Sequence, residues 1–446
     1  MPIALNESIA AHLAEARDSI MPSEDPPRIG WAWMMEEYRV SSERAFRGPN
    51  GSLTVGDGGI AALETAISEL LRDQNTRTLW REEDIWTTVL SLLGAAALNN
   101  QLDLLSAVRK IRRPEAVRSV AAIANVSWAS APQTFGNFSI AALDKPEQAR
   151  DLAAFLKVDG LGLEAIAEHS VQLHRAFGPH VLATSTSPRQ GEFAHSDFAR
   201  ELDDLIGLTL LFAPNLNDFN VLSRRGSTNR PGMRGLALDR GALAQLLSDK
   251  GSGELAASVL SIAGWGGQTG IRWYSASPMP LDQLLAGEAG AIVGDLLRAT
   301  DAIAQRLRVA ARWYARSFWS DADDDAALAL SVALDSLLTG KDAVPGAVSK
   351  GRFALLERDP AHRAERFRRY DEVYQVRNAI AHGGDGTRRL EAIGGANSML
   401  EDARWVAEKL LELRRVSKPL TDKAFRELWD GVQWGTVEWA SPRTSA

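Results

Sequence analysis

Arg377, Asn378 and His382 have side chains and a spacing that could perform phosphodiester chemistry. They lie in the run Arg377-Asn-Ala-Ile-Ala-His382, directly before Gly383. The planar guanidinium of an arginine can bind two phosphate oxygens and stabilise the charge that builds on them. A histidine at the end of a helix suits a proton donor to a leaving oxygen, because the negative end of the helix dipole favours the imidazolium form. Together they could support attack by a ribose 2′-hydroxyl on the adjacent phosphate without a metal, which requires RNA as the substrate.

The Arg–His spacing alone is weak support for a site. Chance predicts roughly two matches in a chain of this composition, and three are present. The segments Arg175–His180 and Arg189–His195 fit the spacing as well as Arg377–His382. A Gly-Pro dipeptide breaks any helix in the first segment, and Pro188–Gly191 makes the second a loop. Only the third match is predicted to lie on a continuous helix.

That helix is predicted over Ala364–His382 and is stopped by Gly383-Gly384. At 100° per residue, its apolar side chains form one stripe, and Arg377 falls within it, about 20° from Tyr370. A guanidinium in a buried face needs an acidic partner or a hydrated cleft, which can lie between subunits. The apolar residues of the stripe are Tyr370, Val373, Tyr374, Ile380 and Ala381. Asn378 and His382, four residues apart, stack on a neighbouring face.

Asp335 is the obvious partner for Arg377. It lies in a predicted helix, Ala326–Leu338, that is apolar nearly all round, so an ionised carboxylate there should be paired. Each of the four residues also has a structural interpretation. Arg377 could form only an internal ion pair with Asp335, His382 could serve as a C-terminal helix cap, and Asn378 could be a solvated polar residue. Asp335 itself is expected to be structural more than catalytic.

Around these residues the chain resembles HEPN domains, particularly the Apea-like group. The resemblance covers about Arg306–Leu413 and rests on three segments: Arg312-Trp-Tyr-Ala-Arg316, Ser331-Val-Ala-Leu-Asp-Ser-Leu-Leu338 and Tyr374-Gln-Val-Arg-Asn-Ala-Ile-Ala-His-Gly-Gly384. It implies a homodimer in which the Arg-Asn…His helices of two subunits face each other across a shared RNA cleft. It also implies a role in antiviral defence or toxin–antitoxin biology, with a phage-derived molecule or an antitoxin as regulator. In one departure from the family, Asp335 stands where the second helix often has glutamate.

The predicted fold class is mainly α: a C-terminal four-helix HEPN-type bundle preceded by a larger, mostly helical N-terminal region with some short strands. Helical periodicity is found over 59–74, 82–113, 146–156, 161–177 and 193–211, and Met1–Ile20 forms an amphipathic helix. Strand-like or loop-like pieces are expected at 48–58, with Ser52–Val55 as a short strand, and at 126–140, 180–188 and 223–234. The Gly- and Pro-rich stretch Gly264–Pro280 has no helical period, so we place a junction near residue 285.

After this junction we expect a long helix from Leu281 or Glu288 to Phe318. A second helix, capped by Ser320–Asp323, should end at Gly340, and further helical segments are expected at 347–356, 364–382 and 397–415. Residues 1–285 would form a sensor or regulatory region of unknown type, and residues 286–416 the HEPN-like domain. The tail, 417–446, would pack on the body through Trp429, Trp434 and Trp439.

Length, composition and net charge limit the classes of protein to which the chain can belong. A chain of 446 residues with 45% hydrophobic residues can fill two or three cores. We expect a soluble, cytoplasmic protein without membrane contact, because there is no charged-then-apolar leader and no apolar run of membrane-spanning length. Zero cysteines exclude disulfides, thiol nucleophiles and thiolate metal sites. The net charge of −7 argues against general coating of nucleic acid, but residues 298–415 hold 20 Lys and Arg against 18 Asp and Glu. An RNA site should therefore lie in the C-terminal third.

No metal and no cofactor are assigned. Asp321–Asp325 lacks the turn glycine and the bidentate glutamate of a calcium loop, so it is expected to cap a helix. Gly264–Gly270 has the wrong spacing for a phosphate-binding loop, and His169 and His174 lack a zinc spacing.

The predicted function is a metal-independent endoribonuclease of a defence or toxin type. The alternative is a non-catalytic HEPN module that binds RNA or a nucleotide, or dimerises, to regulate a partner. An enzyme within the N-terminal region is a weaker possibility, since that region shows no triad, metal cluster or phosphate loop.

Overall fold

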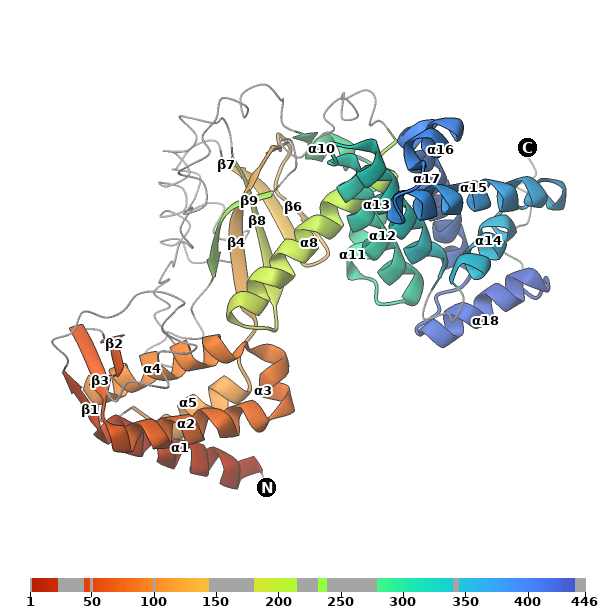
Figure 1. Cartoon of the computed structure of the whole chain (residues 1–446). Helices are drawn as coiled ribbons and strands as arrows, with labels where there is room; N and C mark the ends of the chain where they lie inside the picture. The colour runs from red at the N-terminus through yellow and green to blue at the C-terminus, as the bar shows by residue number, and fades with distance from the viewer. Residues whose placement is uncertain are drawn as a thin grey trace.

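The computed structural model describes residues 2–22, 44–48, 51–98, 102–143, 180–214, 232–238, 279–339 and 345–437. Within these residues the chain is mainly helical with a few short strands, which confirms the predicted mainly α class (Figure 1). No helix among them is long and apolar enough to span a membrane. The predicted helices 146–156 and 161–177, most of Gly264–Pro280, and His169 and His174 lie outside the described residues.

The N-terminal part, residues 2–112, is a helical layer beside a small antiparallel sheet of order β1-β3-β2 (Figure 1). Its apolar side chains, among them Ile9, Leu13 and Leu63, form a separate hydrophobic cluster. The helices are α1 (Pro2–Asp18), α2 (Asp57–Arg72), α3 (Gln74–Leu79), α4 (Glu82–Leu98) and α5 (Leu104–Arg112), and the strands are β1 (Ile20–Pro22), β2 (Arg44–Gly48) and β3 (Gly51–Val55). The single helix predicted over 82–113 is thus two helices. The second starts at Asp103, whose carboxylate accepts a hydrogen bond from the Ser106 backbone N–H at 3.1 Å.

A five-stranded antiparallel sheet of order β6-β7-β8-β4-β9 forms the middle of the molecule. Its strands are β4 (Val117–Ala124), β6 (Gln133–Phe135), β7 (Phe138–Leu143), β8 (His180–Ser187) and β9 (Gly232–Leu238). Helix α8 (Gly191–Phe212) covers one face of this sheet and contacts β4, β8 and β9 (Figure 1). Two further short strands, β5 (Val126–Ser127) and β10 (Met279–Pro280), pair in parallel. Pieces of this sheet were predicted from the sequence, but β4, the strand that joins β8 to β9, was not.

The C-terminal part is a block of helices in which α13 packs against α12, α15 and α17. The helices are α10 (Leu281–Leu284), α11 (Glu288–Arg298), α12 (Ala302–Phe318), α13 (Asp323–Leu338), α14 (Pro345–Leu355), α15 (Arg363–Ala381), α16 (Gly386–Ala392), α17 (Gly395–Val416) and α18 (Asp422–Gln433). A single 3-10 turn, Pro360–His362, precedes α15. The helices predicted over 347–356, 364–382 and 397–415 are confirmed within one or two residues.

The long helix predicted up to Phe318 is broken between α11 and α12. Asp301 starts α12 by accepting a hydrogen bond from the Ala304 backbone N–H at 3.0 Å. The same carboxylate lies 2.9 Å from Nε of Arg414, and both side chains are about 95% buried. Because the buried pair fixes Asp301 in the extended conformation of an N-cap, the helical period cannot run through it.

The start of α13 and the tail each differ from prediction at one residue. The N-cap of α13 is Ala322, which makes no side-chain cap, although Asp323–Asp325 give the first turn its expected negative charge. In α18, Trp429 is buried as predicted, whereas Trp434 is 75% exposed and is not an apolar anchor. Gly340 and Trp439 lie outside the described residues.

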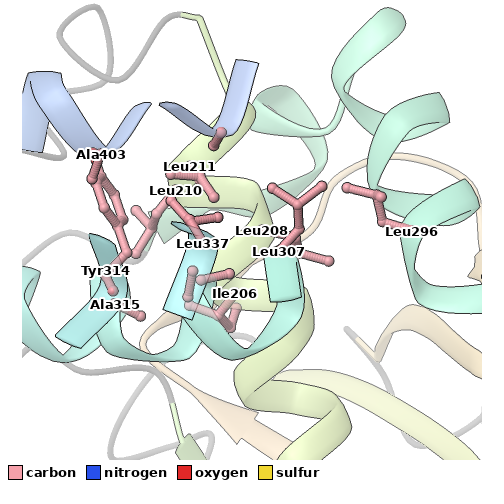
Figure 2. Packing of buried hydrophobic residues seen from close by; sticks show 14 of the residues in the cluster. Ile206, Leu208, Leu210, Leu211, Leu296, Leu307, Tyr314, Ala315, Leu337 and Ala403 are labelled. Carbon is pink, nitrogen blue, oxygen red and sulfur yellow. The ribbon is translucent and has the colours of Figure 1, made fainter. Parts of the chain in front are cut away.

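One hydrophobic cluster joins α8 to the C-terminal helices. Figure 2 shows Ile206 and Leu208 of α8 packed among Leu307 and Tyr314 of α12, and Leu337 of α13. The cluster extends from Ile123 in the sheet to Val432 in α18. The division of the chain at residue 285 stays a prediction, but apolar packing continues across it.

Candidate functional site

The end of α15 is shaped by a glycine turn. Gly383 adopts φ +71°, a left-handed conformation that other residues rarely adopt. Its N–H donates to the Ile380 carbonyl at 3.3 Å, and the Gly384 N–H donates to the Ala379 carbonyl at 2.7 Å. These two bonds form a Schellman motif, so the stop predicted at Gly383-Gly384 is confirmed. His382 is consequently the C-cap residue, directly after Ala381 at the end of the helix, and is exposed.

Arg377 lies at the edge of the buried face of α15. That face consists of Tyr370, Val373 and Val376, through which α15 packs against its neighbours, whereas Arg377 is half-buried. Its guanidinium carbon lies 5.8 Å from the centroid of the Tyr374 ring, which is within range of a cation–π contact. No other described residue forms a hydrogen bond or ion pair with the guanidinium. The donors of Arg377 are therefore not taken up by a carboxylate of the described chain.

Asp335 does not pair with Arg377, contrary to the expected partnership. Its carboxylate accepts hydrogen bonds from the Tyr370 hydroxyl at 2.7 Å and from the Ser349 hydroxyl at 3.2 Å. Burial, together with the adjacent Asp335 carboxylate, raises the pKa of the Tyr370 hydroxyl. The bonds tie α13 to α14 and α15, so the residue contributes to packing of the helix that carries Arg377.

Asn378 and His382 lie one helical turn apart, as predicted. Asn378 is half-buried, and its carbonyl accepts the His382 backbone N–H at 3.1 Å. Their side chains form no hydrogen bond with each other or with any other described residue. The end of α15 thus presents a guanidinium, an amide and an imidazole that the described part of the chain leaves open to a ligand.

The other two Arg–His pairs have different surroundings. Arg175 lies outside the described residues. Arg189 donates from Nε to the Asp197 carboxylate at 2.7 Å, and α8 begins at Gly191, so His195 lies in a helix instead of the predicted loop. The hydrogen bond to Asp197 raises the pKa of Arg189, although burial of the guanidinium acts in the opposite direction. The Arg189 pair therefore belongs to an ion-pair network.

A second charged site was not predicted from the sequence. It is a cleft of about 540 Å³ between α8, α11, α12 and the β6–β7 hairpin, which we call the arginine cleft. It is lined by Phe135, Asn137, Phe138, Arg189, Asp197, Arg200, Glu201, Asp204, Leu297, Gln305, Arg308, Val309 and Arg312. The spacing of Asp197, Glu201 and Asp204, and of Arg308 and Arg312, puts each set on one helical face. This spacing, on helical faces that also carry core residues, is the signal in the sequence that could have indicated the cleft.

The carboxylates of the arginine cleft are perturbed by burial. Burial raises the pKa of Asp204 to about 7, although the nearby guanidinium groups of Arg312, Arg308 and Arg200 act in the opposite direction. Burial also raises the pKa of Glu201, whose carboxylate accepts a hydrogen bond from the Ser185 hydroxyl. Perturbed carboxylates gathered in a cleft are typical of binding sites and of structural ion-pair networks alike.

No group of three or more His, Asp or Glu side chains that could hold a metal ion occurs among the described residues. No protein-family model, curated protein or solved structure matches the chain.

Proposed function

We propose that this chain is a metal-independent endoribonuclease of a defence or toxin type, with Arg377 and His382 as its catalytic residues. The observation that carries the proposal is that neither side chain, at the end of α15, forms a hydrogen bond or ion pair with another described residue. Arg377 has no carboxylate partner among the described residues, and His382 is exposed one residue before the Gly383 turn. A half-buried arginine without an internal partner is suited to an anion from outside.

In the proposed reaction, Arg377 binds the scissile phosphate and stabilises the charge that builds on its oxygens. The ribose 2′-hydroxyl attacks phosphorus, the bond to the 5′-oxygen breaks, and His382 donates a proton to that leaving oxygen. The proton of the 2′-hydroxyl is accepted by His382 of a second copy across a shared cleft. The products are a 2′,3′-cyclic phosphate and a 5′-hydroxyl. Asn378 would orient the phosphate, and Asp335 would position α15 through Tyr370.

A homodimer supports this chemistry better than a single chain. One copy supplies a single guanidinium and a single imidazole, whereas an acid and a base are both needed. Two α15 helices facing each other would provide both. The same helix also exposes an apolar side chain, Phe367, to 45%. We place the protein in the cytoplasm, where RNA is present. A chain without cysteines has no disulfides that the reducing conditions there could break.

The test is cleavage of RNA by the purified full chain in EDTA, with sequencing of the RNA ends. We expect discrete cuts that leave 2′,3′-cyclic phosphates, and a loss of at least about 100-fold in rate for His382→Ala. His362→Ala is the matched control, because this histidine is exposed at the other end of α15 and should be dispensable. Unchanged cleavage by His382→Ala would overturn the proposal.

Expression in cells covers the case in which a phage-derived molecule or an antitoxin controls the activity. Growth arrest and discrete RNA cuts should occur with the wild-type chain and not with His382→Ala. In vitro, Arg377→Ala should lose cleavage, whereas Arg368→Ala, an exposed arginine on the same helix, should keep it. A monomer at every concentration in a solution mass measurement would contradict the shared cleft.

The rival function is a non-catalytic module that binds RNA or a nucleotide and regulates a partner. The net charge of −7 argues against general binding of RNA, and so favours a regulatory role over cleavage of RNA. Binding of RNA without turnover under each trigger tested would support this rival and exclude the nuclease.

A further inference from the structure

The arginine cleft holds more guanidinium donors than its own carboxylates use. Arg308 donates from Nη1 to the carbonyl oxygens of Leu296 and Ala299, and its Nε and Nη2 form no hydrogen bond among the described residues. Arg312 donates no hydrogen bond to a described residue. Arg189 and Arg200 both pair with Asp197. The two arginines of α12 thus have guanidinium donors that form no hydrogen bond to a carboxylate of the described residues.

Asp204 does not satisfy these donors. Its Oδ1 lies 2.9 Å from Nε of Arg312, but the two atoms do not have hydrogen-bonding geometry, and both are buried without a hydrogen-bond partner. The residue is 94% buried, which penalises its charged form. When Asp204 is neutral, Arg308 and Arg312 are two adjacent half-buried cations to which no carboxylate of the described residues is hydrogen-bonded. A partly buried cation with unsatisfied donors is costly, so the site favours an added anion.

We infer that the arginine cleft binds a small organic molecule that carries a phosphate monoester. A dianionic phosphate matches two cations, and the fork of each guanidinium can bind two phosphate oxygens. The volume of about 540 Å³ lies in the range of small-molecule sites. Beside the arginines, Leu297, Val309 and Phe135 form an apolar wall, and Gln305 and Asn137 offer amides. These features suit the organic part of a molecule of about nucleotide size.

The ligand would bridge two parts of the fold. Arg308 and Arg312 belong to α12 in the C-terminal helices, whereas the opposite wall belongs to α8 and the β6–β7 hairpin. Binding would therefore tighten the contact between the sheet layer and the helical block. The site is independent of the proposed nuclease, since it contains none of Arg377, Asn378 and His382.

The experiment titrates the full chain with adenosine 5′-monophosphate, with inorganic phosphate and with adenosine, in a buffer free of phosphate, by calorimetry and thermal unfolding. We expect the monophosphate to bind and raise the Tm, phosphate to bind more weakly, and adenosine not to bind. Arg312→Gln should weaken monophosphate binding at least about tenfold. Arg316→Gln is the matched control, because Arg316 stacks on Trp313 in the same helix and does not line the cleft.

A second variant guards against misfolding. Arg312→Lys keeps the charge but loses the planar fork, so binding should be weakened while the Tm without ligand stays near that of the wild type. Three outcomes would overturn the inference: equal binding by wild type and Arg312→Gln, an equal rise in Tm with chloride at the same ionic strength, or binding of free phosphate without the monophosphate. None of these readouts depends on RNA cleavage.

Discussion

The buried carboxyl group of Asp204 makes the stability of the fold depend on pH. Burial raises its pKa from 3.8 to about 7, so between about pH 4 and pH 7 the folded chain holds a proton that the unfolded chain has lost. The stability that this proton gives is complete below about pH 4 and is lost as the pH rises through 7. Arg312, Arg308 and Arg200 oppose the shift, and Asp203 adds to it.

Asp204→Asn should remove this pH dependence. The amide stays neutral, so the variant should gain stability relative to the wild type between pH 5 and pH 8, by on the order of 2–4 kcal/mol. Denaturant unfolding at the two pH values in phosphate-free buffer measures the difference. Asp203→Asn, one residue away, is the control and should show no comparable gain. An equal difference in stability between Asp204→Asn and the wild type at both pH values would show that the carboxyl group titrates normally in the fold.

Gly207 sets how closely α8 approaches α12. A Cβ built on this glycine would overlap the carbonyl oxygen of Ala311 and lie 2.5 Å from the carbonyl carbon, both of them backbone atoms that cannot rotate away. This contact of Gly207 with Ala311 is adjacent to the cleft residues: Asp204 lies three residues before Gly207 on α8, and Arg308 and Arg312 flank Ala311 on α12. Close helix packing at this point therefore positions one wall of the arginine cleft.

Gly207→Ala should destabilise the chain by about 1–3 kcal/mol, even though alanine is the better helix former. The added methyl group must push α8 and α12 apart. Gly294→Ala in α11 is the matched control, since its nearest neighbour outside the helix, the Phe135 ring, would lie at an ordinary 3.9 Å. We expect that control to be neutral or stabilising by up to about 1 kcal/mol. Chemical denaturation measures both, and a stable Gly207→Ala would show that the two helices can separate at little cost.

Local signals predicted the helices well, and long-range contacts explain what was missed. The ends of α15 depend on adjacent residues such as Gly383, so the sequence was sufficient there. The break before α12 depends on Arg414, which lies 113 residues away. β4 was missed because Val117–Ala124 has three alanines and two valines in a pattern without alternation, and its partners β8 and β9 lie far along the chain.

The same distinction holds for the sites. Arg377 and His382 could be proposed from the sequence because type, spacing and a glycine stop lie within eight residues. The expected Asp335–Arg377 pair was wrong because a helical wheel shows which face of a helix is buried but not which side chain of the neighbouring helix it contacts. The Asp335 carboxylate accepts a hydrogen bond from the Tyr370 hydroxyl instead. The arginine cleft was missed because its two helices, α8 and α12, are separated by about 90 residues of sequence.

The described residues form two hydrophobic cores. The first lies within Ile9–Ile111, the second extends from Ile123 to Val432, and they share no buried apolar residue. Gln190 links the parts: its backbone N–H donates to the Leu79 carbonyl at 2.8 Å, and its side chain donates to the Glu115 carbonyl at 2.7 Å. A few polar bonds couple folding much less strongly than shared apolar burial.

We therefore expect damage to one core to leave the other folded. Leu63→Ala and Leu334→Ala are matched changes, because both leucines are fully buried, one in each core, and each should cost about 2–5 kcal/mol. In hydrogen exchange on the full chain, Leu63→Ala should speed exchange in α1, α2 and α4 and leave α12, α13 and α17 unchanged. Leu334→Ala should have the opposite pattern. If either variant speeds exchange throughout, the two cores unfold as one cooperative unit, and a signal received by the N-terminal part could reach α15 directly through the fold.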